Sequence, residues 1–449
     1  MSSKSNPLRF AVGLAALCAA SGALAADLMQ VYRDALSYDA QYAAARATAA
    51  AGRERLPQAL AGLLPSVNAT GSTYWNGSHY DYRPGGSSAT QSYRNRYNTN
   101  SYGASLTQPL FRWQNWVQYD QAKLLVMQAE ATFAQAGQEL IVRVAQAYFD
   151  VLFASENLRA VQAEKTAIGQ QLEQAKKNFE VGTATITDTY ESQSRFDLAR
   201  AKEIAAESEL EVKRYALRAL IGNEPGELNR LKDKAVVQPP QPASMEPWVD
   251  AAERDSFLVQ AQQAAAEAAG RAVEVSRAGH YPTLDVVANY SANSSPGQFG
   301  IGEIDTRTRQ LGLQLNIPIF QGGAVNSRTR EAAAKRDAEL SALDNARRNS
   351  ALNARQAYLG VVSGLAQVRA LEAALVSSLS SLESNRLGYE VGVRINIDVL
   401  NAENQVYVTR RDLAKARLDT LLAQLKLKAA VGALGEADLE QINALLEVR

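Results

Sequence analysis

The segments FEVGTATITD (Phe179–Asp188) and YEVGVRINID (Tyr389–Asp398) are two copies of one sequence, and the match around them decides the fold. It extends on both sides at a constant offset of 210 residues, without an insertion. One inserted residue would rotate everything beyond it by about 100° on a helix, so the uninterrupted match preserves the helix faces. Each copy therefore indicates a helical hairpin that turns at Val-Gly. Other identities at this offset include Tyr148 with Tyr358, Arg159-Ala160 with Arg369-Ala370, Leu172 with Leu382, and Gly222 with Gly432.

Proline placement leaves room for very long helices in both copies. No proline occurs between Pro109 and Pro225, and none follows Pro318. Proline in a helix interior costs roughly 3 kcal/mol, and both intervals are rich in good helix formers such as Ala, Glu, Gln and Leu. We predict a helix over about 113–180, some 100 Å long at about 1.5 Å per residue. Helices predicted over about 28–60 and 185–222 have nearly the same summed length, so they would run beside it end to end.

Ahead of each long helix, two stretches alternate between apolar and small polar residues. LPSVNATGSTYW (Leu64–Trp75) corresponds to YPTLDVVANYSAN (Tyr281–Asn293), and LTQPLF (Leu106–Phe111) resembles LNIPIF (Leu315–Phe320). This period-two alternation over about ten residues is typical of membrane β-barrel strands, and a half-buried strand of a soluble sheet gives the same pattern.

Long loops rich in Gly, Ser, Asn and Tyr are expected between these strands, at 76–101 and 292–306. Such loops suit the outer face of a barrel, and a disordered surface loop has the same composition. Each half thus contributes two strands, but four strands cannot close a membrane barrel, which usually needs at least eight. Open edges are not tolerated in lipid. If these strands lie in a membrane, several copies of the chain must share one barrel.

The first 25 residues have the pattern of a secretory signal peptide. Lys4 and Arg9 form its basic region, an apolar run (10–20) follows, and Ala-Leu-Ala (23–25) supplies the cleavage site. The run is too short for a membrane-spanning helix, which needs about 20 residues. Cys18 lies inside this segment behind a leucine, which is a poor fit for lipidation, so we expect the segment to be removed.

We divide the chain into this signal peptide (1–25), a first structural repeat (26–235) and a second repeat of the same layout (236–449). Without Lys4 and Arg9 the chain carries 45 basic residues against 47 acidic ones, a net charge near −2. Nucleic-acid binding calls for a basic surface, so no nucleic acid is expected as a partner.

The sequence contains no constellation that points to catalysis. No cysteine remains after the signal peptide, and the two histidines, His79 and His280, are isolated. We therefore expect no metal site and no cofactor. The phosphate-loop, dinucleotide-binding and HExxH motifs are absent. Paired charges on helices are usual on solvated faces, and we expect that the protein is not an enzyme.

Several motifs follow one another in a fixed order: LMQVYRDAL (28–36), GHYPTLD (279–285), LGYEVGVRINIDVLNAENQVY (387–407) and LKLKAAVGALGEADL (425–439). Together with the first hairpin segment and the PLF/PIF pair, they resemble the TolC-like outer-membrane channel proteins over essentially the whole chain after the signal peptide. The resemblance implies an α+β membrane protein: a trimeric, twelve-stranded outer-membrane β-barrel, with four strands per chain, continuous with a long α-helical periplasmic barrel and built by internal duplication.

The resemblance also implies a function. The protein would be the outer-membrane exit duct of a tripartite efflux pump or a type I secretion system, passing drugs or unfolded proteins to the exterior. It would form a homotrimer in outer-membrane lipid and dock a periplasmic adaptor (membrane fusion) protein and an inner-membrane pump of RND, ABC or MFS type. Iris-like movement of the helical hairpins would open it.

The resemblance assigns a gate latch to the hairpin tips. Thr187 and Asp188 of the first hairpin would bond to Tyr389 and Arg394 of the second. An exposed Arg–carboxylate contact is worth about 0–1 kcal/mol, weak enough for a docking partner to undo. Asp188 also suits helix N-capping after the turn, and both roles can operate together.

The resemblance places the pore constriction at Asp398, where three copies around an axis would attract cations. One helical turn on, the family pattern has a second aspartate and this chain has Asn401, which predicts weaker cation trapping. At Arg386 the family pattern has an acidic partner for the position of Gln171, so a third contact of the gate is absent or rewired here.

The two turn glycines, Gly182 and Gly392, match the positions where adaptor tips would meet the channel. A helix-ending turn requires glycine in any case, and that explanation is at least as good. A rival function for the whole chain is a soluble periplasmic coiled-coil adaptor or scaffold without a pore. That rival accounts for the long hairpins but leaves the four barrel-like strands unexplained.

Overall fold

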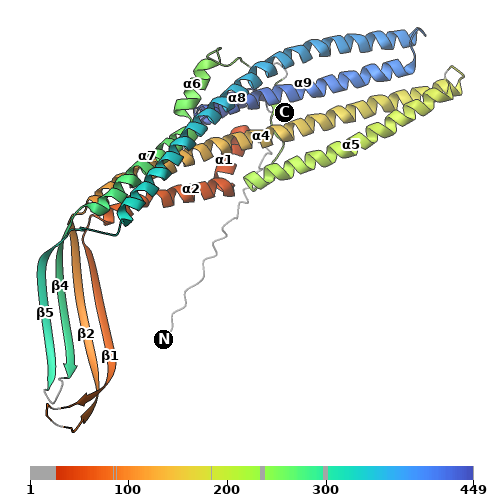
Figure 1. The fold of residues 1–449 in the computed structure, drawn as a ribbon. Helices are drawn as coiled ribbons and strands as arrows, with labels where there is room; N and C mark the ends of the chain where they lie inside the picture. The colour runs from red at the N-terminus through yellow and green to blue at the C-terminus, as the bar shows by residue number, and fades with distance from the viewer. Residues whose placement is uncertain are drawn as a thin grey trace, which may run out of the picture.

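The structure is a computed structural model that describes residues 27–447, apart from 84, 87, 184, 233–237 and 297–301. The predicted signal peptide lies outside the described residues. The molecule is long, with its four-stranded sheet at one end and the tips of the helical hairpins at the other (Figure 1). Its elements are α1 (Leu28–Tyr38), α2 (Ala40–Arg53), α3 (Arg55–Ala61), β1 (Ser66–Tyr82), β2 (Gln91–Phe111), α4 (Trp113–Glu180), α5 (Ile186–Ile221), β3 (Arg230–Leu231), α6 (Glu246–Asp255), α7 (Phe257–Arg277), the 3-10 turn η1 (Ala278–His280), β4 (Thr283–Pro296), β5 (Glu303–Asn316), α8 (Ala324–Glu390), α9 (Asn396–Ala430), α10 (Glu436–Asn443) and β6 (Leu446–Glu447).

The strands are longer than the apolar alternation indicated. β1 and β2 remain paired as far as Tyr82 and Gln91, so the loop expected at 76–101 is wrong. β4 and β5 remain paired as far as Pro296 and Glu303, so the loop expected at 292–306 is also wrong. Backbone pairing carries both hairpins beyond the apolar stretch, where polar side chains no longer mark a strand in the sequence.

The four long strands form one antiparallel sheet in the order β1-β2-β4-β5, and its two faces differ in chemistry. One cross-strand row is apolar throughout: Val67, Leu106, Ala288 and Leu311. The adjacent row, which points to the opposite face, is polar throughout: Asn68, Ser105, Asn289 and Gln310. Side chains alternate between faces along each strand, so the sheet has one face suited to lipid and one suited to water.

The sheet joins the helices through a bidentate ion pair. Arg112, between β2 and α4, donates from Nε to Asp285 Oδ1 at 2.8 Å and from Nη2 to Oδ2 at 2.6 Å. The Asp285 side chain, on β4, is only 9% exposed. The planar fork of arginine fixes orientation as well as distance. The pair therefore sets the geometry where the chain passes from sheet to helix.

The long helices match the prediction, and one flanking helix does not. α4 covers the predicted 113–180, and α5 covers the predicted 185–222 within one residue at each end. The helix predicted at 28–60 is instead three helices, α1 to α3. Asp39 ends α1 and caps α2, with its carboxylate accepting from Tyr42 N at 2.6 Å and from Arg143 Nη2 at 2.9 Å. A side-chain oxygen that satisfies the first N–H groups of a new helix favours such a break.

Figure 1 shows α2 along one half of α4 and α5 along the other, with α8 and α9 forming the second hairpin. The main core lies midway along the helices and includes Leu28, Tyr148 and Leu421, each 0% exposed. The duplicated tyrosines act alike: the hydroxyl of Tyr148 donates to Asn229 O, and that of Tyr358 donates to Ala243 O. Both tyrosines therefore hold the segment that links the two halves.

α8 contains an 18-residue window with a mean hydropathy of 1.5, and by length and composition alone it would pass for a membrane span. Only 11% of that window is buried within the single chain. The helix packs on α7 and α9, and its 67 residues far exceed the roughly 20 that a bilayer needs. Within the single chain, the window is an exposed apolar surface on a much longer helix.

Candidate gate at the hairpin tips

The two hairpin turns have the same backbone geometry. α4 ends at Glu180 and α8 at Glu390, and the glycine two residues on has φ +77° in both. In both turns the N–H after the glycine returns to a carbonyl of the last helical turn: Thr183 N to Asn178 O and Val393 N to Gly388 O, each 2.8 Å. This is the glycine C-cap that ends many helices. The turn itself therefore requires Gly182 and Gly392, and their role in adaptor contact stays a prediction.

The helices that leave the turns begin differently. Thr185 caps α5 in a capping box: its hydroxyl accepts from Asp188 N at 3.3 Å, and the Asp188 carboxylate accepts from Thr185 N at 2.9 Å. At the equivalent position before α9 stands Ile395, which has no side-chain cap bond. Asp398, the counterpart of Asp188, lies 3.6 Å from Arg394 Nη1 instead. One Thr-to-Ile difference thus releases Asp398 from capping.

The predicted latch residues bond locally in the single chain. Within the described residues, neither Thr187 nor Asp188 forms a hydrogen bond or ion pair with Tyr389 or Arg394. Tyr389 does reach the first hairpin, where its hydroxyl accepts from Asn178 Nδ2 at 3.5 Å. The N-capping role considered for Asp188 is the one this structure contains.

A buried carboxylate joins the hairpins closer to the middle. Glu403 on α9 is 2% exposed, and its two oxygens accept from different hairpins. Arg386 Nη2 on α8 donates to Oε1, and Gln171 Nε2 on α4 donates to Oε2 at 3.0 Å. The sequence analysis expected the contact between the positions of Gln171 and Arg386 to be absent or replaced. In this structure both side chains bond to Glu403 instead of to each other.

Sequence reasoning missed Glu403, although a signal was present. The buried face of α9 runs Asn396, Val399, Leu400, Glu403, Val406, Thr409 and Leu413, at helical spacing. A glutamate within such a stripe is almost never buried without a partner. Burial raises the pKa of the Tyr407 hydroxyl one turn on, and the charge of Glu403 adds to that rise.

Further contacts between the hairpins surround this carboxylate. Asn396 Nδ2 donates to Ser192 Oγ at 3.0 Å, and both side chains are buried. Arg195 Nη2 donates to Asn401 Oδ1 at 3.0 Å on the surface. Asn401 is thus engaged with the first hairpin and adds no charge next to Asp398. Apolar packing of Ile168, Ala199 and Leu400 completes the contact.

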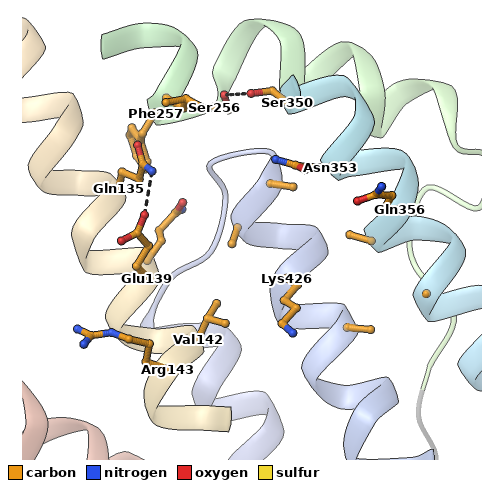
Figure 2. Close-up of a pocket in the computed structure, with 17 residues that line it drawn as sticks. Gln135, Glu139, Val142, Arg143, Ser256, Phe257, Ser350, Asn353, Gln356 and Lys426 are labelled. Atoms are coloured by element: carbon orange, nitrogen blue, oxygen red, sulfur yellow. Dashed lines mark hydrogen bonds between the residues drawn. The ribbon is translucent and has the colours of Figure 1, made fainter. Parts of the chain in front are cut away.

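A separate hollow of about 680 Å³ lies away from the tips, between α4, α8, α9 and the start of α7. Figure 2 shows Ser256 bonded to Ser350 across it and Gln135 to Glu139 along α4, at 3.1 and 2.8 Å. Its described lining holds no histidine, cysteine or aspartate. Within the described part of the chain, no group of three or more His, Cys, Asp or Glu side chains is placed to hold a metal ion.

Comparison with known proteins identifies the family. Residues 31–223 and 248–433 each match the outer membrane efflux protein family. The chain belongs to that family. The outer membrane efflux proteins it resembles include TolC of Vibrio cholerae, 32% identical over 430 residues that cover 95% of each chain. The alkaline protease secretion protein AprF of Pseudomonas aeruginosa is 31% identical, with 94% of this chain and 88% of that protein covered.

Solved structures agree on the fold. The outer membrane channel CmeC of Campylobacter jejuni superposes with a TM-score of 0.76 at 16% identity, covering 94% of this chain and 90% of that one. VceC of Vibrio cholerae gives a TM-score of 0.74 at 17% identity, covering 90% and 96%. The two family matches confirm the internal duplication, and membership confirms an outer-membrane channel protein of the efflux and secretion class. None of these comparisons supports the alternative function of a soluble periplasmic adaptor or scaffold without a pore.

Proposed function

We propose that three copies of this chain form one exit duct across the outer membrane and the periplasm. The observation that carries the proposal is the sheet, which has an apolar face, a polar face and unpaired outer edges on β1 and β5. Each unsatisfied backbone group in lipid costs several kcal/mol, so these edges must pair. Pairing β5 of each copy with β1 of the next closes a barrel of twelve strands with its polar face inward.

Exposed apolar side chains on the helices support the same assembly. They lie on α5 and on α8, the two helices that form outer sides of the single chain. Single exposed apolar residues need no explanation, but several along one helix indicate a contact surface. A neighbouring copy would cover them and continue the tunnel below the barrel. The residues concerned are Leu198, Ile204, Val212 and Tyr215 on α5, and Leu352, Leu359, Val362 and Val376 on α8.

The hairpin tips form the gate of this duct. Near the turns the polar contacts of Arg394 and Tyr389 are long, at 3.6 and 3.5 Å. Farther from the turns, the contacts converge on the buried carboxylate of Glu403. A docking partner at the turns would therefore meet the weakest contacts first. In the closed trimer Thr187 and Asp188 pair with Tyr389 and Arg394, and the α8–α9 hairpin swings away when those pairs break. Glu403 holds the two hairpins together behind the latch.

Asp398 forms the constriction. Three copies of this carboxylate around the axis attract cations and slow anions. Asn401 contributes an amide bonded to Arg195, so the ring carries one charge per copy. The entrance is thus cation-selective but traps multivalent cations less strongly than a doubled acidic ring would.

The duct passes drugs or unfolded proteins that reach it from an inner-membrane pump of RND, ABC or MFS type through a periplasmic adaptor. The adaptor meets the turns at Gly182 and Gly392. Relatives named for protease secretion and for efflux support both kinds of cargo. The chain performs no catalysis in this role.

Extraction and export assays test this function. The chain should require detergent for release from outer membranes and should run as a heat-sensitive trimer on gels. A deletion strain should lose drug resistance, secretion of a protein, or both, and so assign the cargo. Recovery of the intact chain as a monomer from the periplasmic fraction would overturn the proposal.

A further inference from the structure

Two hollows in the described structure occupy equivalent places in the two repeats. The larger, of about 680 Å³, lies between α4, α8, α9 and the start of α7. The smaller, of about 370 Å³, lies between α4, α5 and α9. Residues that line the larger one correspond, at the offset of 210, to residues that line the smaller one, as Ala357 does to Ala147. Side chains at matched positions therefore account for the difference in volume.

An ion pair fills this place in the first repeat and is missing from the second. Lys213 Nζ on α5 lies 2.9 Å from Asp150 Oδ2 on α4. The corresponding residues are Ala423 on α9 and Gly360 on α8. A Cβ atom at Gly360 would lie 3.8 Å from the Cβ atom of Ala423, so the two positions still face each other. The second repeat thus keeps the place of the pair without its side chains.

Two more large side chains of the first repeat are replaced by shorter ones. Arg143 donates to Asp39, the cap of α2, at 2.9 Å. Its counterpart on α8 is Asn353, whose side chain forms no hydrogen bond with any residue that the structure describes. Leu220 at the end of α5 corresponds to Ala430 at the end of α9. Four substitutions at one place have therefore opened the larger hollow.

The larger hollow has the size and lining of a site for a small molecule. Such sites measure about 300–1,000 Å³, are mostly apolar, and have a few polar groups that fix the orientation of the ligand. Phe257, Ala357 and Ala423 contribute apolar surface here. Figure 2 shows Asn353 and Gln356 on α8 beside it, and neither amide is bonded within the described chain.

Three ionisable side chains line this hollow, and one of them has no partner. Glu139 accepts from Gln135 Nε2 at 2.8 Å, and Arg143 pairs with the aspartate that caps α2. Lys426 forms no hydrogen bond or ion pair with a described residue, and its counterpart in the first repeat is Ala216. The unpartnered charge of the hollow is therefore positive and belongs to the second repeat alone.

The hollow opens on the side of α9 that carries Asp398. Buried residues of α9 recur every seven positions, at Val399, Val406, Leu413, Thr420 and Leu427. One position before each of them lie Asp398, Gln405, Asp412, Asp419 and Lys426. A sustained seven-residue repeat keeps equivalent positions on one side of a packed helix. In the proposed duct this side faces the lumen, so a molecule in transit passes the hollow.

The linker between the two repeats covers the other side of α9. Gln424 donates to Gln238 O of this linker, and it lies two residues before Lys426, about 200° away around the helix. On α8, Tyr358 donates to Ala243 O of the same linker. The hollow is therefore entered from the side away from the linker.

We propose that this hollow binds small amphipathic carboxylates on their way through the duct. The carboxylate accepts from Lys426 Nζ in a charge-assisted bond, and the apolar body packs on Phe257 and Ala423. Asn353 and Gln356 bond to further polar groups of the molecule. The inference rests on the proposed function, because only the assembled duct makes this side of α9 luminal.

Ligand protection of a single cysteine tests the inference. The chain has no cysteine after the predicted signal peptide, so Ala357→Cys places the one thiol in the larger hollow and Ala147→Cys places it in the smaller one. Each full-length trimer would be modified by neutral methyl methanethiosulfonate, with and without naphthoate, and the rate followed by mass spectrometry. Naphthoate at about four times its Kd should slow modification at 357 about fivefold, since occupancy scales as 1 + [L]/Kd. We expect no protection at 147 and much weaker protection at 357 by naphthamide or naphthylmethylammonium.

Three variants of the Ala357→Cys protein make the outcome decisive. Lys426→Gln should reduce protection by naphthoate to the level of naphthamide. Gly360→Asp with Ala423→Lys rebuilds the ion pair of the first repeat and should abolish protection. Lys415→Gln, which removes an exposed lysine of α9 outside the hollow, should change nothing.

Equal protection at 357 and 147, or equal protection by the anion, the amide and the ammonium ion, would overturn this inference and leave the proposed function standing. Full protection by naphthoate in the Lys426 variant, with trimers intact, would do the same. Absence of trimers in the unmodified protein would overturn the proposed function itself, and with it the luminal position of the hollow.

Discussion

Glu403 is the residue on which the contact between the hairpins depends most. Its carboxylate is buried, and it is shared by a guanidinium from α8 and an amide from α4. A buried charge is tolerated only when such partners surround it, and removing one partner leaves an expensive unpaired group. The Arg386 side chain is 56% exposed, so water can weaken that half of the bridge when the tip moves.

Replacing this carboxylate should loosen the gate. Glu403→Gln keeps the size of the side chain but removes the charge-assisted bond, worth about 1.5–3 kcal/mol. We expect roughly a tenfold shift toward the open state, seen as a higher open probability in planar bilayers. Glu383→Gln, an exposed glutamate on α8, is the matched control. An unaltered channel in the Glu403 variant would contradict the role assigned here.

In the proposed duct, Asp398 is the residue that we expect to supply the charge of the constriction. Asp398→Asn should lower cation selectivity, measured as a smaller reversal potential across a salt gradient, and should weaken block by multivalent cations. Asn401→Asp should act in the opposite direction by adding a second carboxylate one turn away. Identical reversal potentials in all three proteins would remove both residues from the pore.

At the scale of elements, the two hairpins share one turn but differ in how the returning helix starts. The Gly182 and Gly392 turns are superimposable in their φ values and bonds. α5 then begins with a capping box and α9 with none. Asp188 caps its own helix, whereas Asp398 makes no capping bond and lies 3.6 Å from Arg394 Nη1 instead. The two copies of this element therefore differ in what the equivalent aspartate bonds to.

Restoring the cap to α9 should test this division. Ile395→Thr would let residue 395 bond with Asp398 as Thr185 bonds with Asp188, stabilising the first turn of α9 by about 1 kcal/mol. We expect slower hydrogen exchange at the start of α9 and lower cation selectivity, because the carboxylate turns toward the backbone. Thr185→Ile should speed exchange at the start of α5 and leave selectivity unchanged. Faster exchange in the Ile395 variant would speak against the capping argument.

At the scale of the whole molecule, the sheet cannot be stable in lipid as a single copy. Adjacent cross-strand rows point to opposite faces of the sheet. Neighbouring residues on β5 therefore have opposite surroundings in the assembled barrel. Leu313 faces outward and Gln314 faces the lumen. The same substitution at these two positions therefore tests which face of the sheet meets lipid.

Arginine at position 313 should destabilise the barrel far more than arginine at 314. Leu313→Arg places a charge on lipid at a cost of about 2–4 kcal/mol per copy, whereas Gln314→Arg faces water. We expect the first variant to lose the heat-resistant trimer at a lower temperature on gels and the second to behave like the unmodified protein. Equal effects would mean that the faces are assigned wrongly.

The sequence alone was sufficient for the duplication, the two long helices, the turn glycines and the family. Those features depend on local or repeated sequence. The absence of proline from the long helices, the helical spacing of apolar residues and the match at an offset of 210 residues can all be seen in the sequence itself. The strand ends were not readable, because beyond Tyr74 or Ser294 pairing depends on a neighbouring strand and the side chains no longer alternate. The break at Asp39 was missed because an N-cap competes with helix continuation only when its partners, here Tyr42 and Arg143, are in place.

The contacts between the two hairpins were decided by the tertiary structure. Arg386 and Asn401 could be recognised as unusual from the sequence, but their partners are Glu403 and Arg195, one 17 residues away on a neighbouring helix and the other 206 residues away on the other hairpin. Composition and periodicity specify which face of a helix is buried. They do not specify which side chain of another helix that face meets, because this depends on how far one hairpin slides along the other. For the same reason, the sequence determined that this chain belongs to the outer-membrane channels, and only the packing of its two halves determined which residues bond the hairpins to one another.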